Sequence, residues 1–436
     1  MAVLLAVAAW WQAVASGAIH ELPIDTLTAM ARRAGLRVIE SDRLVLVTDR
    51  PPREGDGVEE LPAVFDQAFA SWCDHYAIPI ETLPRWRAFG CLVVDRERFR
   101  AAGLLTDDTP EFANGFCDRH RFWMMDQSNP AYRRHLLLHE GVHAFTITVR
   151  DLAAPAWYAE GIAEYLATHR LDADGDAMRF VATPIPDRAS DVEQLGRIER
   201  LHELRAAGMR PALADVLEAN AGRHHDISDY AASWATVAFL AGHPTYAQTF
   251  AMVGRGPLDP TLNDRLAAMS SYDATRAGRD FDAFTDDLDY GYDFGRSAID
   301  WSPGRPLVSP ERVEVAADRG WQNSGLALAK GRAYDLHATG RCPLGRVDDT
   351  RIESEAEGIS VEWYRGRPLG RLLAAQWVEK PTEGGRPRFV IIGEGAKARL
   401  LAATDGPLYF KLNDRPGSLA DNSEALVVVL RSATTP

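Results

Sequence analysis

The residues best suited to chemistry stand in the segment His139-Glu140-Gly141-Val142-His143. Two histidines four positions apart lie one turn apart on one face of a helix, so both imidazoles can reach the same metal ion. Zinc accepts such nitrogen ligands readily. The carboxylate of Glu140 stands beside them, where it can accept a proton from a water. The segment therefore predicts a metal-binding helix with an adjacent base, although the bare pattern also arises as a polar turn of an amphipathic helix.

The next expected helix, residues 156–168, carries two carboxylates one turn apart. Glu160 follows His143 by 17 residues, which is enough for one helix to end and another to return antiparallel. A catalytic zinc site uses three protein ligands and keeps one position open, and the third ligand is commonly a carboxylate. We therefore expect Glu160 as the third ligand and Glu164 as the partner of a ligating imidazole's second N–H. Apolar neighbours disfavour the alternative of a solvated helix face.

At these residues the sequence resembles the gluzincin metallopeptidases, in which HExxH precedes an E-G-x-A-E-Y segment. The strand and helix order before the motif is similar to bacterial peptidase-like domains of that superfamily. The likeness covers roughly residues 40–255, and the aminopeptidase strand signature is absent, with Asn114-Gly115-Phe116 no substitute for it. The resemblance implies that Glu140 is general base on a zinc-activated water and then general acid. It also implies three zinc ligands: His139, His143 and Glu160.

A second donor is needed to stabilise the oxyanion that forms during hydrolysis. In gluzincins a Tyr or His from a downstream helix often supplies it, and Tyr230 lies in a segment of that kind. The alternative for Tyr230 is a core or half-buried tyrosine. His224, His225 and His243 are the other candidates for the donor, while His135 is expected on the surface or behind the ligands rather than as a fourth ligand.

The surrounding sequence predicts the elements that position these residues. Short β-branched or aromatic runs indicate strands, and apolar residues three and four apart indicate helices. The pattern predicts a mixed region with a few strands followed by a mostly helical region. Together with the resemblance, it implies an α+β zincin-like domain with a small sheet, active-site helices and a helical C-terminal half. The expected strands are 43–49, 89–95 and 116–125, and the expected helices are 61–76, 132–149, 156–168, 192–207, 212–221 and 230–253.

The domain order follows from changes in composition along the chain. We expect a signal peptide at 1–18, the metallopeptidase-like domain at 19–296, a linker rich in Pro, Gly and Ser at 297–310, and an all-β sandwich at 311–436. Short strands at regular spacing, separated by turn residues, predict the sandwich.

The N-terminal residues indicate the cellular compartment in which the protein acts. The apolar stretch from Ala2 to Trp11 is too short to span a bilayer and suits a signal peptide, followed by an Ala13-Val14-Ala15 cleavage pattern. A buried first helix and an uncleaved anchor are the alternatives. We expect a secreted or periplasmic protein without a transmembrane segment in the mature chain.

The chain has 436 residues and a formal net charge of −14, so it is a poor candidate for nucleic-acid binding. Its hydrophobic content of 46% excludes a disordered chain.

Among its four cysteines, we expect a disulfide bridge between Cys91 and Cys117, because both lie on candidate neighbouring strands.

A loop near the C-terminus is dense in short oxygen-bearing side chains, the ligands that Ca²⁺ prefers. A polar hairpin loop is the plain alternative. With the Trp321–Gly340 block, the loop resembles the calcium-dependent galactose-binding bacterial lectins of PA-IL type over about 311–431, although the lectins' His and Gln sugar contacts have no clear counterpart. The resemblance implies a further backbone-carbonyl ligand near Leu344. Its implied side-chain ligands are Asp414, Ser418, Asp421 and Asn422.

Taken together, these patterns predict a secreted zinc metallopeptidase, a hydrolase of gluzincin type, acting on a peptide or protein substrate. The sandwich adds a candidate attachment to carbohydrate or a cell surface. The alternative is a catalytically weak zinc-binding domain that acts as a carbohydrate- or surface-binding protein through the sandwich.

Overall fold

The computed structural model describes residues 22–174, 177–192, 195–219, 226–308, 310–347, 350–381 and 385–433. The expected signal peptide at 1–18 and the candidates His224 and His225 lie outside these residues. The chain divides into two units. The first comprises Met1–Glu203, Leu213–Ala241 and Thr245–Asp273, and the second comprises Leu204–Ala212, Gly242–Pro244 and Ala274–Pro436. Residues 274–296, which the sequence assigned to the first domain, group with the second unit.

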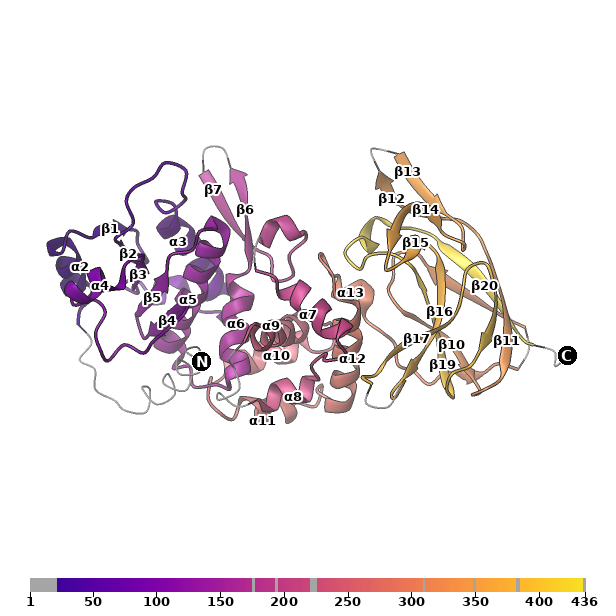
Figure 1. Ribbon diagram of the computed structural model, residues 1–436. Helices are drawn as coiled ribbons and strands as arrows, with labels where there is room; N and C mark the ends of the chain where they lie inside the picture. The colour runs from indigo at the N-terminus through magenta and orange to yellow at the C-terminus, as the bar shows by residue number, and fades with distance from the viewer. Residues whose placement is uncertain are drawn as a thin grey trace. The chain divides into compact units, whose positions relative to one another are not determined.

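A five-stranded sheet forms the N-terminal part of the first unit, in the order β1-β2-β3-β5-β4 (Figure 1). The central strands β2, β3 and β5 run parallel, while β4 pairs antiparallel with β5 and forms an edge. Strands β2 and β3 are buried throughout, as expected for parallel strands covered on both faces. Their bounds are β1 (Arg37–Glu40), β2 (Leu44–Thr48), β3 (Ala88–Val93), β4 (Gly115–Asp118) and β5 (Arg121–Met125).

The expected strand 116–125 is in fact a hairpin. Arg119 adopts a positive φ of 55°, and the chain reverses there between β4 and β5. This turn lacks the Gly or Asn that usually marks such a reversal. The expected Cys91–Cys117 bridge is also wrong, because β5 lies between the strands that carry the two thiols; all four cysteines are free and buried.

Three helices lie at the site, of which the last two carry the candidate ligands and the first packs against both. They are α3 (Leu61–Tyr76), α5 (Pro130–Arg150) and α6 (Ala156–Ala167), close to their expected bounds. The side chain of Asn129 accepts a hydrogen bond from the backbone N–H of Tyr132 and Pro130 occupies the first turn, which together fix the start of α5. At its other end Asp151 adopts a left-handed conformation, and Pro155 then begins α6.

The remaining elements of the first part of the chain are a hairpin and short helices. The expected helix 230–253 is two helices, α9 and α10. Among the helices that the structure describes, none is both long and apolar enough to cross a bilayer. The bounds are α2 (Ile24–Arg33), α4 (Arg96–Ala101), β6 (His169–Asp174), β7 (Ala177–Ala182), α7 (Arg197–Ala206), α8 (Leu213–Glu218), α9 (Ile227–Gly242), α10 (Ala247–Arg255) and α11 (Leu262–Ala267).

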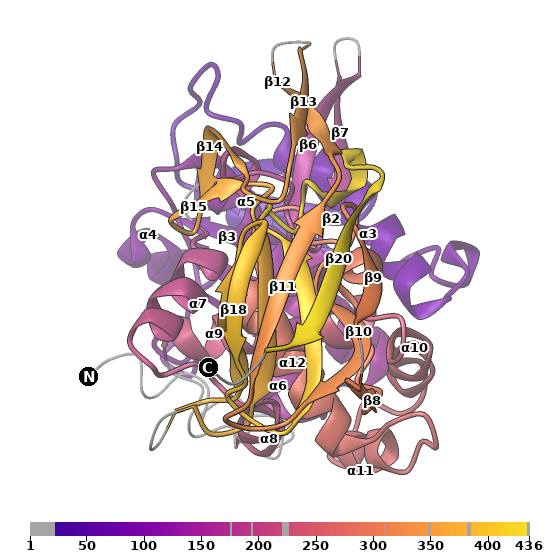
Figure 2. The ribbon, with the colours of Figure 1, turned by 90° about the vertical axis from the view of Figure 1, so that its right-hand side faces the viewer.

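The second unit is largely β, with the helices α12 (Ala274–Asp287) and α13 (Phe294–Ser297) before the strands. One sheet has the order β17-β16-β19-β10-β8. The other has the order β18-β11-β20-β9, and its strands are labelled in Figure 2. An apolar core that includes Leu336, Leu372, Leu408 and Leu430 draws on both sheets. The mixed α+β class is therefore confirmed, with a largely β C-terminal region.

Each strand expected in the sandwich overlaps an observed strand, but β8, β12, β13, β15 and β16 were not predicted from the sequence. The expected strands are 313–316, 325–328, 333–338, 359–364, 389–392, 398–402, 408–412 and 425–430. The bounds are β8 (Arg305–Pro306), β9 (Glu311–Ala316), β10 (Gln322–Leu328), β11 (Ala333–Thr339), β12 (Cys342–Val347), β13 (Thr350–Ser354), β14 (Ile359–Tyr364), β15 (Arg367–Leu369), β16 (Leu372–Val378), β17 (Arg388–Glu394), β18 (Lys397–Leu401), β19 (Gly406–Leu412) and β20 (Ala425–Ser432).

Candidate metal centre

Helices α5 and α6 bring three side chains to one point, as the sequence predicts. His139 Nε2 and His143 Nε2 lie 3.1 Å apart. Glu160 Oε2 lies 3.4 Å from the first nitrogen and 3.5 Å from the second. These atoms form one of two groups in the described residues that can hold a metal ion.

The spacing fits a tetrahedral zinc. Bonds of about 2.0–2.1 Å at tetrahedral angles separate ligand atoms by about 3.3–3.4 Å, close to the three distances found here. Glu160 Oε2 is buried and accepts no hydrogen bond from a described residue. This carboxylate oxygen therefore remains available to coordinate a cation. The donor set of two imidazoles and one carboxylate is also one that zinc prefers.

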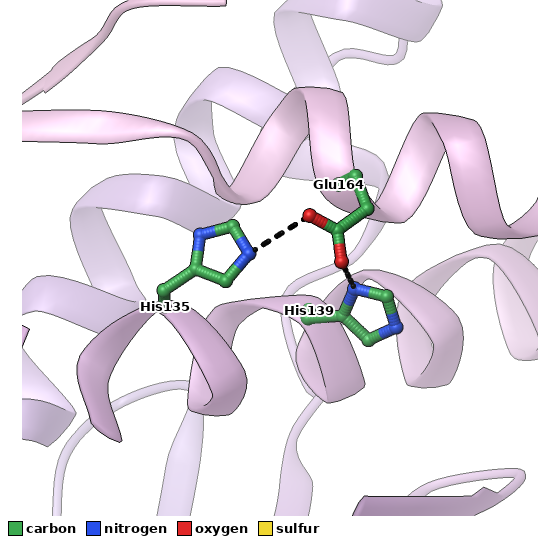
Figure 3. Close-up of side chains that lie close together, drawn as sticks. All are labelled: His135, His139 and Glu164. Atoms are coloured by element: carbon green, nitrogen blue, oxygen red, sulfur yellow. Dashed lines mark hydrogen bonds and ion pairs between the residues drawn. The ribbon is translucent and has the colours of Figure 1, made fainter. Parts of the chain in front are cut away.

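The second group shares His139 and comprises His135, His139 and Glu164 (Figure 3). Glu164 Oε1 lies 3.2 Å from His139 Nδ1, on the side of the ring opposite the Nε2 atom that faces His143. Its other oxygen lies 3.2 Å from His135 Nε2. Glu164 is only 2% exposed. This carboxylate therefore orients the His139 ring, and His135 is buried behind the ligands rather than on the surface.

Electrostatics around the ligands favour a bound cation. Burial lowers the pKa of His139, but the carboxylates of Glu160 and Glu164, which its ring nitrogens face, outweigh burial and raise that pKa to about 10. Burial raises the pKa of Glu160, and the charges of His143 and His139 bring it well below its usual value. Without an ion the cluster thus holds protons, so metal binding would release them.

Glu140 points toward the sheet edge rather than joining the ligands. A Cβ on Gly115, in the edge strand β4, would overlap the Glu140 carboxylate, so only glycine leaves room at this position. Burial raises the pKa of Glu140, against the opposing charges of His139 and His143. The base candidate therefore lies between the ligands and β4.

Tyr230, on α9, lies next to the ligands. Its ring centroid is 6.2 Å from that of His139. The close approach depends on Gly161 of α6, where a Cβ would collide with the Ser233 carbonyl of α9. The charge of Glu160 and then burial raise the pKa of Tyr230 well above its usual value, so the hydroxyl keeps its proton. By contrast, the ring of His243 lies 3.9 Å from the carboxylate of Asp280 in the second unit.

Sequence reasoning missed two residues of this site. Arg197, at the start of α7, binds both Glu164 oxygens, and its guanidinium lies 5.6 Å from the ring centroid of Tyr230. Gly115 lies in the segment Asn114-Gly115-Phe116, to which the sequence assigns no role. Neither position lies in a local motif, and only the packing of α7 and β4 against α5 and α6 reveals them.

In the second unit, the polar loop after β19 brings part of the expected calcium set together. Asn422 Nδ2 donates to Asp414 Oδ2 at 2.8 Å, while Asn422 Oδ1 is buried without a hydrogen-bond partner among the described residues. A Cβ on Gly345 would overlap the Asp421 carboxylate, and Leu344 forms a β-bridge with Asn422. Burial raises the pKa of Asp414. Ser418 is half-buried in the same loop.

No family model matches this chain, and no curated protein matches it. Among solved structures, a chain described as "EclA N-terminal domain; PllA-like lectin" is similar to a C-terminal region of this chain. The two are 20% identical with a TM-score of 0.21, and the match covers 29% of this chain and 98% of the other. The function of this chain is therefore inferred from its own side chains.

Proposed function

We propose that the first unit is a zinc-dependent metallopeptidase of gluzincin type. The observation that carries this proposal is the convergence of His139, His143 and Glu160 on one point, with Glu140 beside it. Zinc, when bound there, would polarise the scissile carbonyl and lower the pKa of a water. A purely structural zinc site would need four protein ligands, whereas this cluster offers three and leaves a position for substrate or water.

Each remaining group has a role that its surroundings support. Glu140 accepts the proton of the attacking water and later delivers it to the leaving amine, and its raised pKa suits both steps. Tyr230 donates its hydroxyl hydrogen to the developing oxyanion. The charge of Glu164, whose Oε1 lies 3.2 Å from His139 Nδ1, favours a proton on that nitrogen and so the tautomer that presents Nε2 to the ion.

An extended peptide is the substrate that the sheet edge suits. Strand β4 pairs with β5 on one side only, so its other edge offers backbone groups to an added strand. Because Gly115 of β4 adjoins Glu140, a peptide paired there would carry a backbone amide past the base. We infer a peptide or protein substrate bound by backbone hydrogen bonds.

The second unit and the N-terminus complete the proposal. We propose that the loop holds calcium through Asp414, Ser418, Asp421 and Asn422, which is supported by the buried oxygen of Asn422 that has no hydrogen-bond partner among the described residues.

We also propose that the protein is secreted or periplasmic and that the apolar segment at 1–18 is its signal peptide. N-terminal sequencing of the mature protein tests the latter.

The test of the proposed function is turnover of a mixed peptide library, read by mass spectrometry. The full chain is stripped with a chelator and then restored with zinc. Cleavage that disappears with the chelator and returns with zinc supports a peptidase. Stoichiometric zinc binding without cleavage of any peptide would instead favour the alternative, a zinc-binding domain whose action lies in attachment through the sandwich.

A further inference from the structure

The second unit contains a pocket of about 620 Å³ that the proposed function does not use. Its wall comes from α12, the segment after α13, the turn between β10 and β11, strands β16 and β17, the segment after β16, and the turn between β18 and β19 with the first half of β19. The volume lies within the range of roughly 300–1,000 Å³ that is typical of small-molecule sites. The pocket is independent of the zinc cluster, since every residue that lines it belongs to the second unit.

The apolar side of the pocket is a rigid aromatic wall. Trp301, Trp377 and Tyr409 line it, and the centroid of the Trp301 ring lies 5.1 Å from that of Trp377 and 5.8 Å from that of Tyr409. Phe389 packs behind them, stacked on Trp301. The indole of Trp301 donates to Asp280 at 2.6 Å, which fixes its orientation. The rings meet edge to face, at 69° and 62°, and the Arg279 guanidinium lies 5.2 Å from the Trp301 centroid, so the wall offers rigid ring edges that need no ordering on binding.

The polar side is cationic. Arg279 balances the negative charge of Glu379, another lining residue. Glu379 Oε1 accepts a hydrogen bond from Arg279 at 2.9 Å and one from the Trp377 indole at 3.1 Å. Lys330 and Lys380 also line the pocket, and neither ammonium group forms an ion pair with a described residue. The chain has only four lysines, so half of them lie at this one pocket.

One carboxylate, that of Asp405, also lines the pocket. Asp405 Oδ1 accepts the backbone N–H of Lys330 at 2.8 Å, which holds the carboxylate at the pocket. A ligand must therefore satisfy three demands together. It needs an apolar C–H part for the ring edges, an anionic group for the ammonium groups, and hydroxyl donors for Asp405. A simple aromatic acid would lack the donors, and a neutral sugar would lack the charge.

We propose that this pocket binds an acidic saccharide unit, a sugar ring that carries a carboxylate or a sulfate. The pocket differs from the candidate calcium loop. Pocket residues on β19 extend to Tyr409, and the loop follows the last residue of that strand, Leu412, so at about 3.4 Å per residue about 10 Å of strand separates the two.

The small number of lysines gives a direct test on the full chain. Lysines are acetylated with a limiting amount of an amine-reactive ester, and each site is quantified by peptide mass spectrometry. The probes are methyl glucuronoside, glucose 6-sulfate and neutral methyl glucoside. At an acidic-sugar concentration ten times Kd, acetylation of Lys330 and Lys380 should slow about tenfold. Exposed Lys397, on β18, serves as the internal control and should keep its rate.

The three probes and a matched pair of variants decide the outcome. Protection by either acidic sugar supports the proposal, and the better probe identifies the anionic group. Equal protection by methyl glucoside, or by sodium acetate or sodium sulfate alone, would overturn it, as would no protection at all. In a tryptophan-fluorescence titration, Lys330→Met should weaken binding about tenfold or more, whereas Lys397→Met should leave it unchanged. Both side chains are exposed, so neither change should affect folding.

Discussion

Arg197 binds the buried carboxylate of Glu164 with two parallel hydrogen bonds. Its Nε lies 3.0 Å from Oε2 and its Nη2 lies 2.7 Å from Oε1. Burial raises the pKa of Glu164, but the charges of Arg197 and His135 bring it well below its usual value. The carboxylate therefore stays ionised and held in place where it meets the His139 ring, and the arginine acts on the metal centre through that ring.

Replacing Glu164 with alanine should weaken zinc binding by roughly 10–100-fold, as loss of a ligand's hydrogen-bonding partner does. Arg197→Lys should weaken it in the same direction but less, because an ammonium cannot reproduce the two-pronged contact. Competition with a chromophoric chelator gives both affinities. Arg200→Lys is the matched control, since Arg200 on the same helix binds Ser228 and Glu203 instead. Equal losses for the two arginine variants would rule out this role.

Gly115→Ala should lower peptide turnover by about tenfold or more while leaving zinc content unchanged. The added methyl group would displace the Glu140 carboxylate and not the ligands. Turnover and zinc content are measured on the same preparation. The control is Gly278→Ala on α12, where a Cβ meets nothing within 4 Å. A turnover that matches the unchanged protein would show that β4 does not constrain the base.

His169 should make the first unit sensitive to mild acid. Burial lowers the pKa of its ring to about 3. The ring is neutral in the fold, with Nδ1 facing the Ala167 carbonyl at 2.7 Å and Nε2 accepting from Arg134. Between about pH 3 and pH 6.5 this histidine binds a proton in the unfolded chain but not in the folded chain. The free energy of unfolding therefore falls as the pH falls.

At pH 5 that loss amounts to about 2 kcal/mol relative to pH 7.5. His169→Gln should remove this contribution, because its amide can replace both hydrogen bonds without titrating, whereas buried His75, whose pKa burial lowers to about 4, keeps its own contribution. Urea unfolding of the full chain at several pH values provides the comparison. His337→Gln, on an exposed position of β11, should retain the slope of the unchanged protein. An unaltered slope in His169→Gln would contradict the assignment.

Calcium should stabilise the second unit by RT ln(1 + [Ca²⁺]/Kd), which is about 2.7 kcal/mol at 100 times Kd. Asp421→Asn should abolish most of that stabilisation, because it removes a carboxylate from an oxygen cage. The measurement is the Tm of the full chain with calcium and with a calcium chelator. Asp335→Asn, on an exposed position of β11, is the control. If the unchanged protein melts identically in both conditions, the loop holds no calcium.

Much of the site could be predicted because its signals are local. The spacing of His139 and His143, and of Glu160 and Glu164, places each pair on one helix face, and α5 and α6 carry clear start and stop signals. The sequence of these two helices was therefore enough to predict that His139, His143 and Glu160 lie close together.

What was missed depends on contacts between distant segments or on ambiguous local patterns. Arg197 lies 33 residues beyond Glu164 on another helix. Strand β16, with the sequence LLAAQWV, is a continuous apolar run, which does not distinguish a buried strand from a helix. The reversal at Arg119 carries no turn residue, so β4 and β5 were read as one strand, and the expected Cys91–Cys117 bridge followed from that error.

The most direct test of the account is zinc content measured beside peptide turnover in Glu140→Gln, with the exposed Glu97→Gln as control. Glu140 is a base and not a ligand, so its variant should keep one zinc per chain and lose at least about 10²–10⁴-fold in turnover. His139→Ala, His143→Ala and Glu160→Ala should lose both zinc and turnover, since each removes one of three protein ligands. Full turnover in Glu140→Gln, with zinc retained, would contradict the proposed mechanism.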